Sequence, residues 1–167
     1  MPIYLAHGAS GNAASMAPYV DGLRARGLEA HTIGLPVRSA EKAVPTFRQQ
    51  VDQPAGATIG GQSYGGRVAS LLAADEKVRG LILISYPLHR PGRPEWEPRT
   101  AHWPIISCPV LLLSGEADPF CRLELLRIAL DRLPDAELVT YPRVGHGLLS
   151  VLDDVVERMV AFEAGLA

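Results

Sequence analysis

The sequence has little cysteine and no long apolar run. Only Cys108 and Cys121 occur among 167 residues, too few for a disulfide framework. Cys121 has no basic neighbour placed to activate its thiol, so we interpret it as a structural residue. No apolar stretch reaches the length of a membrane helix, and the first residues have the pattern of a strand rather than of a signal peptide. We therefore expect a cytoplasmic protein with no membrane partner.

An excess of positive charge and clusters of metal ligands are also missing. The chain has 16 basic and 18 acidic residues, giving a net charge of −2 and a pI of about 6.2, which argues against a nucleic-acid partner. No group of His, Cys and carboxylate residues has metal-ligand spacing, so we expect no metal. What is present, 47% hydrophobic and 20% charged residues, predicts one globular domain over residues 1–167.

Apolar runs and helix-like segments alternate along the chain. The alternation predicts an α/β fold, with a six-stranded, mostly parallel sheet that carries helices on both faces. In the second of the predicted helices, Val44, Phe47 and Val51 are expected to face the sheet. The strands are expected at about 3–6, 29–36, 57–62, 80–86, 110–115 and 136–141, and the helices at about 15–26, 43–52, 64–74, 122–133 and 149–163.

Residues 87–104 interrupt this alternation with five of the 14 prolines. A connection of this length usually covers a site. His89, Trp96 and Trp103, which lie among arginines, could line a pocket for an anionic or aromatic acyl group. The alternative, which we favour for the tryptophans, is a proline-stiffened short cap that packs its indole rings on the body of the protein.

A glycine-rich turn stands between a predicted strand and a predicted helix. It contains Gly61-x-Ser63-x-Gly65, the nucleophile-elbow pattern, in which a serine lies on a sharp turn and larger side chains two residues away would collide. The alternative is a β-to-α turn that packs tightly or holds a phosphate. Arg67 follows in the first helical turn, where a cation opposes the helix dipole, so we expect it to have a carboxylate partner, either in the protein, which we favour, or in a substrate.

Reactive residues follow four of the predicted strands: His7, Ser63, Asp118 and His146. In open α/β sheets, functional groups gather beyond the carboxyl ends of the strands. The order serine, acid, histidine is typical of α/β-hydrolases among the serine-hydrolase folds. A serine hydroxyl needs an adjacent base, and only His146 follows the acid.

With these motifs the chain resembles a small α/β-hydrolase of the dienelactone-hydrolase-like branch, and the likeness spans nearly the whole sequence. It lacks the two initial strands of a complete α/β-hydrolase, which predicts an exposed sheet edge. The resemblance is carried by His7-Gly8-Ala9, Gly61-x-Ser63-x-Gly65, Ser114-Gly115-Glu116-Ala117-Asp118-Pro119-Phe120 and Gly145-His146-Gly147.

The resemblance implies a role for each candidate residue. Ser63 is the expected nucleophile, His146 the base, and Asp118 the acid that orients the imidazole; Glu116 is the competing carboxylate. Asp118 could instead be a helix N-cap before Pro119.

The oxyanion hole is expected to use the backbone N–H groups of Tyr64 and Ala9, with Ser10 as a neighbour that could substitute for Ala9 or line the substrate pocket. His7 is interpreted as a structural residue that holds this loop, with pocket lining as the alternative.

These residues predict a serine hydrolase that cleaves a small or medium ester or acyl substrate through an acyl-enzyme, without a cofactor. Acyl transfer or peptidase action at the same site is a rival. A second rival is a catalytically silent scaffold, because a fold by itself does not imply a function.

Overall fold

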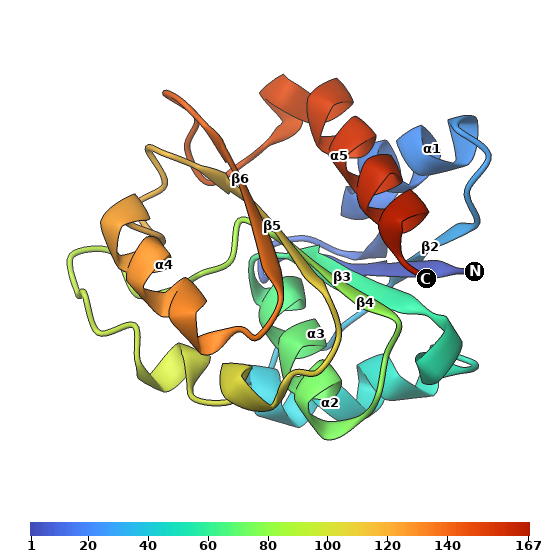
Figure 1. The fold of residues 1–167 in the computed structure, drawn as a ribbon, viewed down its shortest axis with the longest axis horizontal. Coiled ribbons are helices and arrows are strands. Elements are labelled where there is room, and N and C mark those ends of the chain that lie inside the picture. The colour runs from blue at the N-terminus through green and yellow to red at the C-terminus, as the bar shows by residue number, and fades with distance from the viewer.

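Six parallel strands form one sheet in the computed structural model, which describes residues 1–167. Their order is β2-β1-β3-β4-β5-β6, so the predicted fold class is confirmed. All six strands run in one direction, so that their carboxyl ends lie along the left-hand side of Figure 1. The strands are β1 (Ile3–Ala6), β2 (Ala30–Ile33), β3 (Thr58–Gln62), β4 (Gly80–Ile84), β5 (Val110–Gly115) and β6 (Ala136–Tyr141).

The central strands are apolar on both faces because helices cover both sides of the sheet. β4 and β5 are buried along their whole length. Alternate side chains of a strand point to opposite faces, and β4 divides accordingly: Leu81 and Leu83 belong to one core, Ile82 and Ile84 to the other. A continuous apolar run is therefore what a strand in this position requires.

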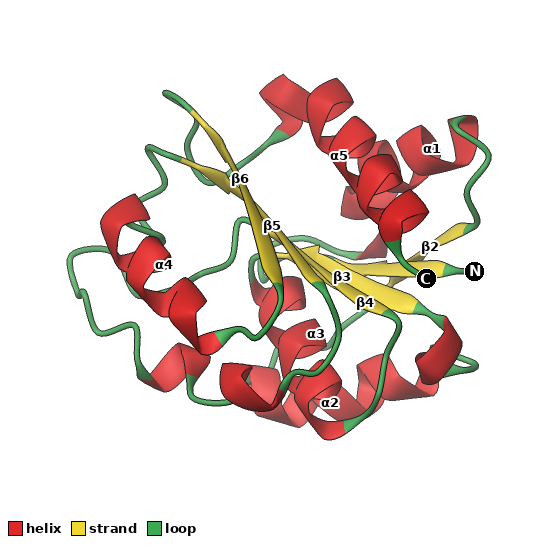
Figure 2. Cartoon of the chain, in the orientation of Figure 1, coloured by secondary structure: helices red, strands yellow, loops and turns green.

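Two helices, α1 (Ala17–Ala25) and α5 (Leu152–Gly165), cover one face (Figure 2). They pack closely where Gly22 meets Val156. A Cβ at residue 22 would lie 2.9 Å from a methyl carbon of Val156, closer than real contacts allow. The first and last helices of the chain are thus held together on the same side of the sheet.

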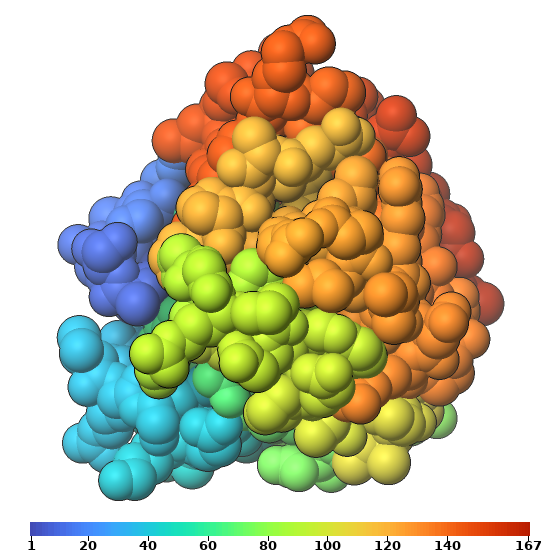
Figure 3. All heavy atoms as spheres, turned by 90° about the vertical axis from the view of Figure 1, so that its left-hand side faces the viewer, coloured from blue at the N-terminus to red at the C-terminus, as the bar shows by residue number.

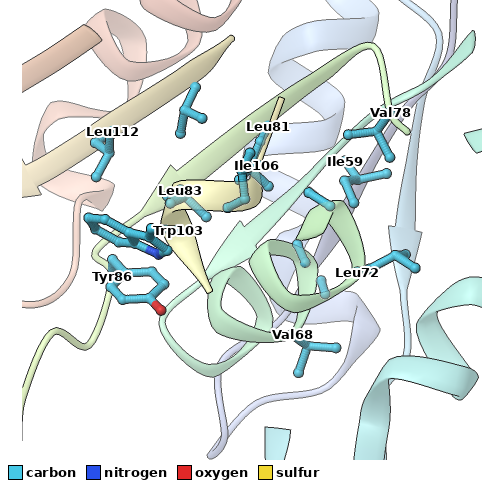
Figure 4. Packing of buried hydrophobic residues seen from close by; sticks show 14 of the residues in the cluster. Ile59, Val68, Leu72, Val78, Leu81, Leu83, Tyr86, Trp103, Ile106 and Leu112 are labelled. Carbon is cyan, nitrogen blue, oxygen red and sulfur yellow. The ribbon is translucent and has the colours of Figure 1, made fainter. Parts of the chain in front are cut away.

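The other face is covered by α2 (Ala40–Gln49), α3 (Tyr64–Asp75) and α4 (Leu123–Ala129). Figure 4 shows the core beneath them, a single cluster to which residues of β3, β4 and α3 and the rings of Tyr86 and Trp103 all belong. The two ring centroids are 5.0 Å apart at an interplanar angle of 60°, an edge-to-face arrangement favourable for aromatic pairs. Part of the 87–104 segment is therefore hydrophobic core.

Helix α2 differs from its prediction. It begins at Ala40 rather than about residue 43, and Pro45 lies inside it. The buried positions are Ala40, Ala43 and Phe47, whereas Val44 is half-buried. The predicted face is nevertheless confirmed, because Phe47 and Val51 are buried in the core and Val44 packs against it. Small alanines, spaced three and four residues apart with Phe47, form the apolar stripe that packs against the sheet.

β2 is one of the two outer strands, and its exposed edge is short. It has four residues, and the Gln50 side chain continues its edge. The Gln50 amide accepts a hydrogen bond from the Gly34 N–H at 3.2 Å and donates one to the Gly34 carbonyl at 2.9 Å. Both backbone groups of Gly34 are thereby satisfied without another strand.

The 87–104 segment contains two short 3₁₀ turns, Pro98–Thr100 and Trp103–Ile105. His102 attaches the segment to α3, because its Nε2 lies 2.8 Å from the Oγ of buried Ser70. Burial, with a smaller effect from the nearby Arg67 guanidinium, lowers the pKa of His102 to about 4. In the unfolded chain the pKa of this ring is about 6.5, well above its pKa in the folded protein.

This attachment predicts acid sensitivity. The stabilisation from neutral His102 is fully present above about pH 6.5 and is lost as the pH falls toward its pKa of about 4, because the unfolded state then binds more protons. Between pH 7 and 4.5 the wild-type Tm should fall further than that of His102→Gln, whose neutral amide can still reach Ser70. Thermal unfolding at several pH values measures this. His31→Gln, at an exposed histidine, is the control; a wild-type-minus-H102Q difference that is constant with pH would contradict the expectation.

No helix of the protein is long and apolar enough to cross a membrane. No group of three or more His, Cys, Asp and Glu side chains is arranged to hold a metal ion.

Candidate active site

Ser63 lies on a strained turn between β3 and α3. Its backbone angles are φ 50° and ψ −118°, a region that non-glycine residues avoid at a cost of about 1–3 kcal/mol. A Cβ at Gly61 would lie 2.6 Å from the Ala6 carbonyl oxygen, and one at Gly65 would lie 2.4 Å from the same atom. Glycine is thus required at both flanking positions, partly by the turn and partly by β1 beside it.

The structure brings Ser63, His146 and Asp118 together. The imidazole Nε2 lies 2.9 Å from the Ser63 Oγ, and Nδ1 lies 2.7 Å from the Asp118 Oδ2. With the proton on Nδ1, the ring donates to Asp118 and accepts from the serine hydroxyl. The Asp118 side chain is fully buried, whereas the His146 side chain is 28% exposed. The residues come from loops after three different strands.

Backbone contacts join the loops that carry Asp118 and His146. The Ala117 N–H donates to the Val144 carbonyl at 2.9 Å. The close approach depends on Gly115, the last residue of β5. A Cβ there would lie 2.2 Å from the carbonyl oxygens of both Val144 and Gly145. By contrast, Gly145 and Gly147, which flank the histidine, have open space around them.

Two further contacts hold the acid and base in place. The second carboxylate oxygen of Asp118 accepts the Phe120 N–H at 2.8 Å. The Phe120 ring packs on the imidazole of His146, with centroids 4.5 Å apart. The sequence motif contained Phe120, but nothing in its spacing predicted a contact with a histidine 26 residues later.

His7 and His89 are anchors rather than pocket-lining residues. Both are buried, 4% and 1% exposed. In each ring Nδ1–H donates to the carbonyl of the next residue, at 2.7 Å and 2.8 Å. Each Nε2 accepts a backbone N–H from a neighbouring loop, that of Leu35 for His7 and that of Arg122 for His89. The structural interpretation of His7 fits these contacts, whereas placing His89 in a substrate pocket was wrong because both of its nitrogens are occupied.

The tryptophans also lie away from the triad. Trp103 is fully buried in the core, so it cannot line a substrate pocket. Trp96 lies under the guanidinium of Arg132, 4.7 Å from the ring centroid. Because Arg132 precedes β6, this contact is at the amino end of the sheet. The favoured interpretation of a cover that packs its indole rings on the body matches both positions.

The backbone donors expected to form an oxyanion hole have no partners in the chain. Tyr64 is the first residue of α3, so its N–H has no intrahelical acceptor. The N–H of Ala9 makes no hydrogen bond with the protein, and Ser10 is exposed on the same turn. This loop lies against the nucleophile, because a Cβ at Gly8 would be 3.8 Å from the Ser63 Cβ.

Other predicted partners can now be assigned. Glu116 does not contact His146; its carboxylate accepts a hydrogen bond from Thr140 at 2.8 Å. Arg67 pairs with Glu41 at 2.9 Å, so the prediction of a carboxylate partner in the protein is confirmed. Cys121 is buried, and burial raises the pKa of its thiol to about 12, which makes it a poor nucleophile.

Figure 3 looks onto the end of the sheet where these groups meet. The loops after β1 (blue), β2 (light blue), β4 (yellow-green) and β5 (yellow-orange) come together there. Chemically, the arrangement has a serine hydroxyl on a strained backbone turn, in contact with the imidazole base. A buried carboxylate holds the other side of the imidazole, and backbone N–H groups without partners belong to the segments next to the serine.

A family model for the alpha/beta hydrolase domain matches residues 35–149, more than half of the chain. The chain belongs to the alpha/beta hydrolase family. Residues 35–149 include Ser63, Asp118 and His146, while the loop after β1 lies outside the matched range.

Solved structures of alpha/beta hydrolases are similar over nearly the whole chain. A monoacylglycerol lipase from Paleococcus ferrophilus has a TM-score of 0.82 at 15% identity, covering 96% of this chain and 94% of that one. A pyrethroid hydrolase from Sphingobium faniae JZ-2 has a TM-score of 0.72 at 18% identity, with 99% and 98% covered. Est1E from Butyrivibrio proteoclasticus has a TM-score of 0.75 at 15% identity, with 98% and 88% covered. At these identities the likeness concerns the fold.

Proposed function

We propose that this alpha/beta hydrolase is a carboxylesterase-like serine hydrolase that acts through an acyl-enzyme on Ser63. The observation that carries the proposal is the unbroken hydrogen-bond chain from the Ser63 hydroxyl through His146 to Asp118, with distances of 2.9 Å and 2.7 Å. These are contact distances at which a proton can pass from nucleophile to base.

In the first half of the reaction, the Ser63 Oγ attacks the ester carbonyl carbon while its proton moves to Nε2 of His146. Asp118 stabilises the imidazolium that forms, through the bond it accepts from Nδ1–H. The N–H groups of Tyr64 and Ala9 donate to the carbonyl oxygen as it becomes an oxyanion. When the tetrahedral intermediate collapses, the C–O bond to the alcohol breaks and His146 returns the proton to the leaving alkoxide.

In the second half, water takes the place of the alcohol. His146 removes a proton from the water, and the resulting hydroxide attacks the acyl carbon. Collapse breaks the bond to Ser63, whose oxygen recovers the proton from His146, and the free acid leaves. The chain thus needs no group other than its own side chains and backbone donors.

The surroundings of the triad favour small or medium esters. Two exposed apolar side chains belong to segments that follow strands: Val37, after β2, is 92% exposed, and Leu149, three residues after His146, is 58% exposed. The Tyr64 hydroxyl holds the loop of Val37 by donating to the Pro36 carbonyl at 3.0 Å. An acyl or alcohol group can rest on such side chains without entering a deep cavity.

Covalent trapping tests the proposal. A fluorophosphonate probe should label the protein once, at Ser63, because only an activated serine displaces fluoride at a useful rate. Ser63→Ala should abolish labelling, while Ser10→Ala, at an exposed serine on the loop after β1, should retain it. A folded wild-type protein that takes no label would favour the silent scaffold.

A further inference from the structure

A cavity lined by five charged side chains and one proline lies between α3 and the 87–104 segment. Its volume is about 370 Å³. Most of the groups around it carry positive charge, which is unusual in a protein whose net charge is −2. The walls are formed by Arg67, Arg90, Arg93, Glu95, Pro98 and Arg99.

Three of these arginines have no carboxylate partner. No Asp or Glu oxygen lies within 4.0 Å of the guanidinium groups of Arg90, Arg93 or Arg99. Arg90 and Arg93 are exposed, and their side chains make no hydrogen bond. Arg99 is half-buried and donates only to the Pro87 carbonyl, at 2.8 Å. Most of the guanidinium N–H groups in the cavity are therefore free to bind a ligand.

The fourth arginine is only partly satisfied. Arg67 donates Nη2–H to Glu41 at 2.9 Å, but its buried Nε has no hydrogen-bond partner. Burial, with the neighbouring Arg67 and Arg90 guanidinium groups, lowers the pKa of Arg99. Like charges have thus been brought together in partly desolvated surroundings, and a bound anion would offset their repulsion.

The charged side chains at the cavity have a net positive charge. Four arginines against Glu95 and the Glu41 carboxylate on Arg67 give +4 − 2 = +2. A single carboxylate would balance half of this excess, whereas a phosphate monoester carries a charge of about −2 near neutral pH. Guanidinium forks also match the oxygens of phosphate in paired hydrogen bonds.

Helix α3 links the cavity to the nucleophile. Arg67 lies one turn beyond Ser63 on α3, its N–H donating to the Ser63 carbonyl at 3.0 Å. One turn of helix separates the two Cα atoms by about 6 Å along the axis. The residues 87–95 that bring Arg90 and Arg93 to the cavity follow β4, the neighbour of β3, and form the yellow-green surface in Figure 3.

We infer that this arginine cavity binds a phosphate group carried by the substrate whose carbonyl Ser63 attacks. The inference rests on the proposed function for the carbonyl but on the arginines alone for the phosphate. The two parts can therefore fail separately.

Binding of inorganic phosphate tests the cavity without any turnover. Calorimetric titration at low ionic strength, with Ser63→Ala protein, should detect phosphate binding that is tighter than acetate binding. In the Arg90→Gln/Arg93→Gln variant the affinity for phosphate should fall about tenfold or more, because two charge-assisted contacts are lost. Both side chains are exposed, so the variant should fold.

The matched control is Arg127→Gln/Arg158→Gln, which removes the same charge from exposed positions on α4 and α5. It should bind phosphate as the parent does. Equal weakening in both double variants, or acetate binding as tightly as phosphate, would overturn the cavity assignment. Phosphate binding that depends on Arg90 and Arg93, in a wild-type protein whose Ser63 takes no fluorophosphonate, would support the anion site and contradict the hydrolase.

Discussion

Ser63→Ala should lower kcat for short p-nitrophenyl esters by roughly four to six orders of magnitude. The substitution removes the oxygen that forms the acyl-enzyme, and no other hydroxyl contacts the imidazole of His146. Residual turnover would come only from the oxyanion donors and general binding. Steady-state kinetics, with active-site titration of the wild type, measures the change.

His146→Ala should cause a loss of similar size, and the double variant little more, because residues that act as one unit are not additive. Thermal unfolding of each variant checks that the fold survives. Ser10→Ala is the control and should change kcat by less than about tenfold, since only its backbone is expected near the oxyanion. Retention of most activity in Ser63→Ala would place the chemistry elsewhere.

Gly115→Ala should damage both stability and activity although residue 115 touches no substrate. Its Cβ would lie 2.2 Å from the Val144 and Gly145 carbonyl oxygens, and backbone atoms cannot move aside cheaply. We expect the free energy of unfolding to fall by roughly 2 to 3 kcal/mol and Tm by about 5 to 10 °C. The loop must shift, and His146 with it, so kcat should fall about a hundredfold or more.

Gly145→Ala is the matched control, in the same loop. Apart from its neighbours in the chain, no residue has an atom within 4 Å of a Cβ at residue 145, so Tm and kcat should stay close to wild type. Circular dichroism melts and ester kinetics on both variants make the comparison. Equal effects of the two substitutions would show that the close approach at Gly115 does not position the base.

Much of this architecture follows from local sequence. The apolar runs of β4 and β5 predicted strands buried on both faces, and both are buried throughout. The elbow at Ser63 could be predicted from its local motif, although the structure shows that Gly65 is required by the backbone of Ala6 and His7 rather than by the turn itself. The chain order of Ser63, Asp118 and His146 narrowed the candidate triad to one histidine, since loops that follow parallel strands meet at one edge.

Contacts between segments that are distant in the chain could not be predicted from local sequence patterns. The flanking glycines of His146 drew attention in the sequence, yet the glycine that the geometry requires is Gly115, on another strand. His89 was predicted to line a pocket, but its partners are backbone groups. Every residue has such groups, so the amino-acid sequence does not reveal these contacts. Trp103 belongs to a proline-rich stretch, and the sequence did not show that its ring packs against Tyr86 in the core.

The side-chain amide of Gln50 affects how the edge of the sheet can pair with a second copy of the protein. Its bonds to Gly34 occupy the peptide to which a strand of another molecule would otherwise add, and β2 is itself only four residues long. The Gln50 amide thereby occupies one backbone position, just beyond the end of β2, at which a strand of another molecule could pair. A short edge capped in this way leaves a second molecule fewer free backbone groups with which to extend the sheet.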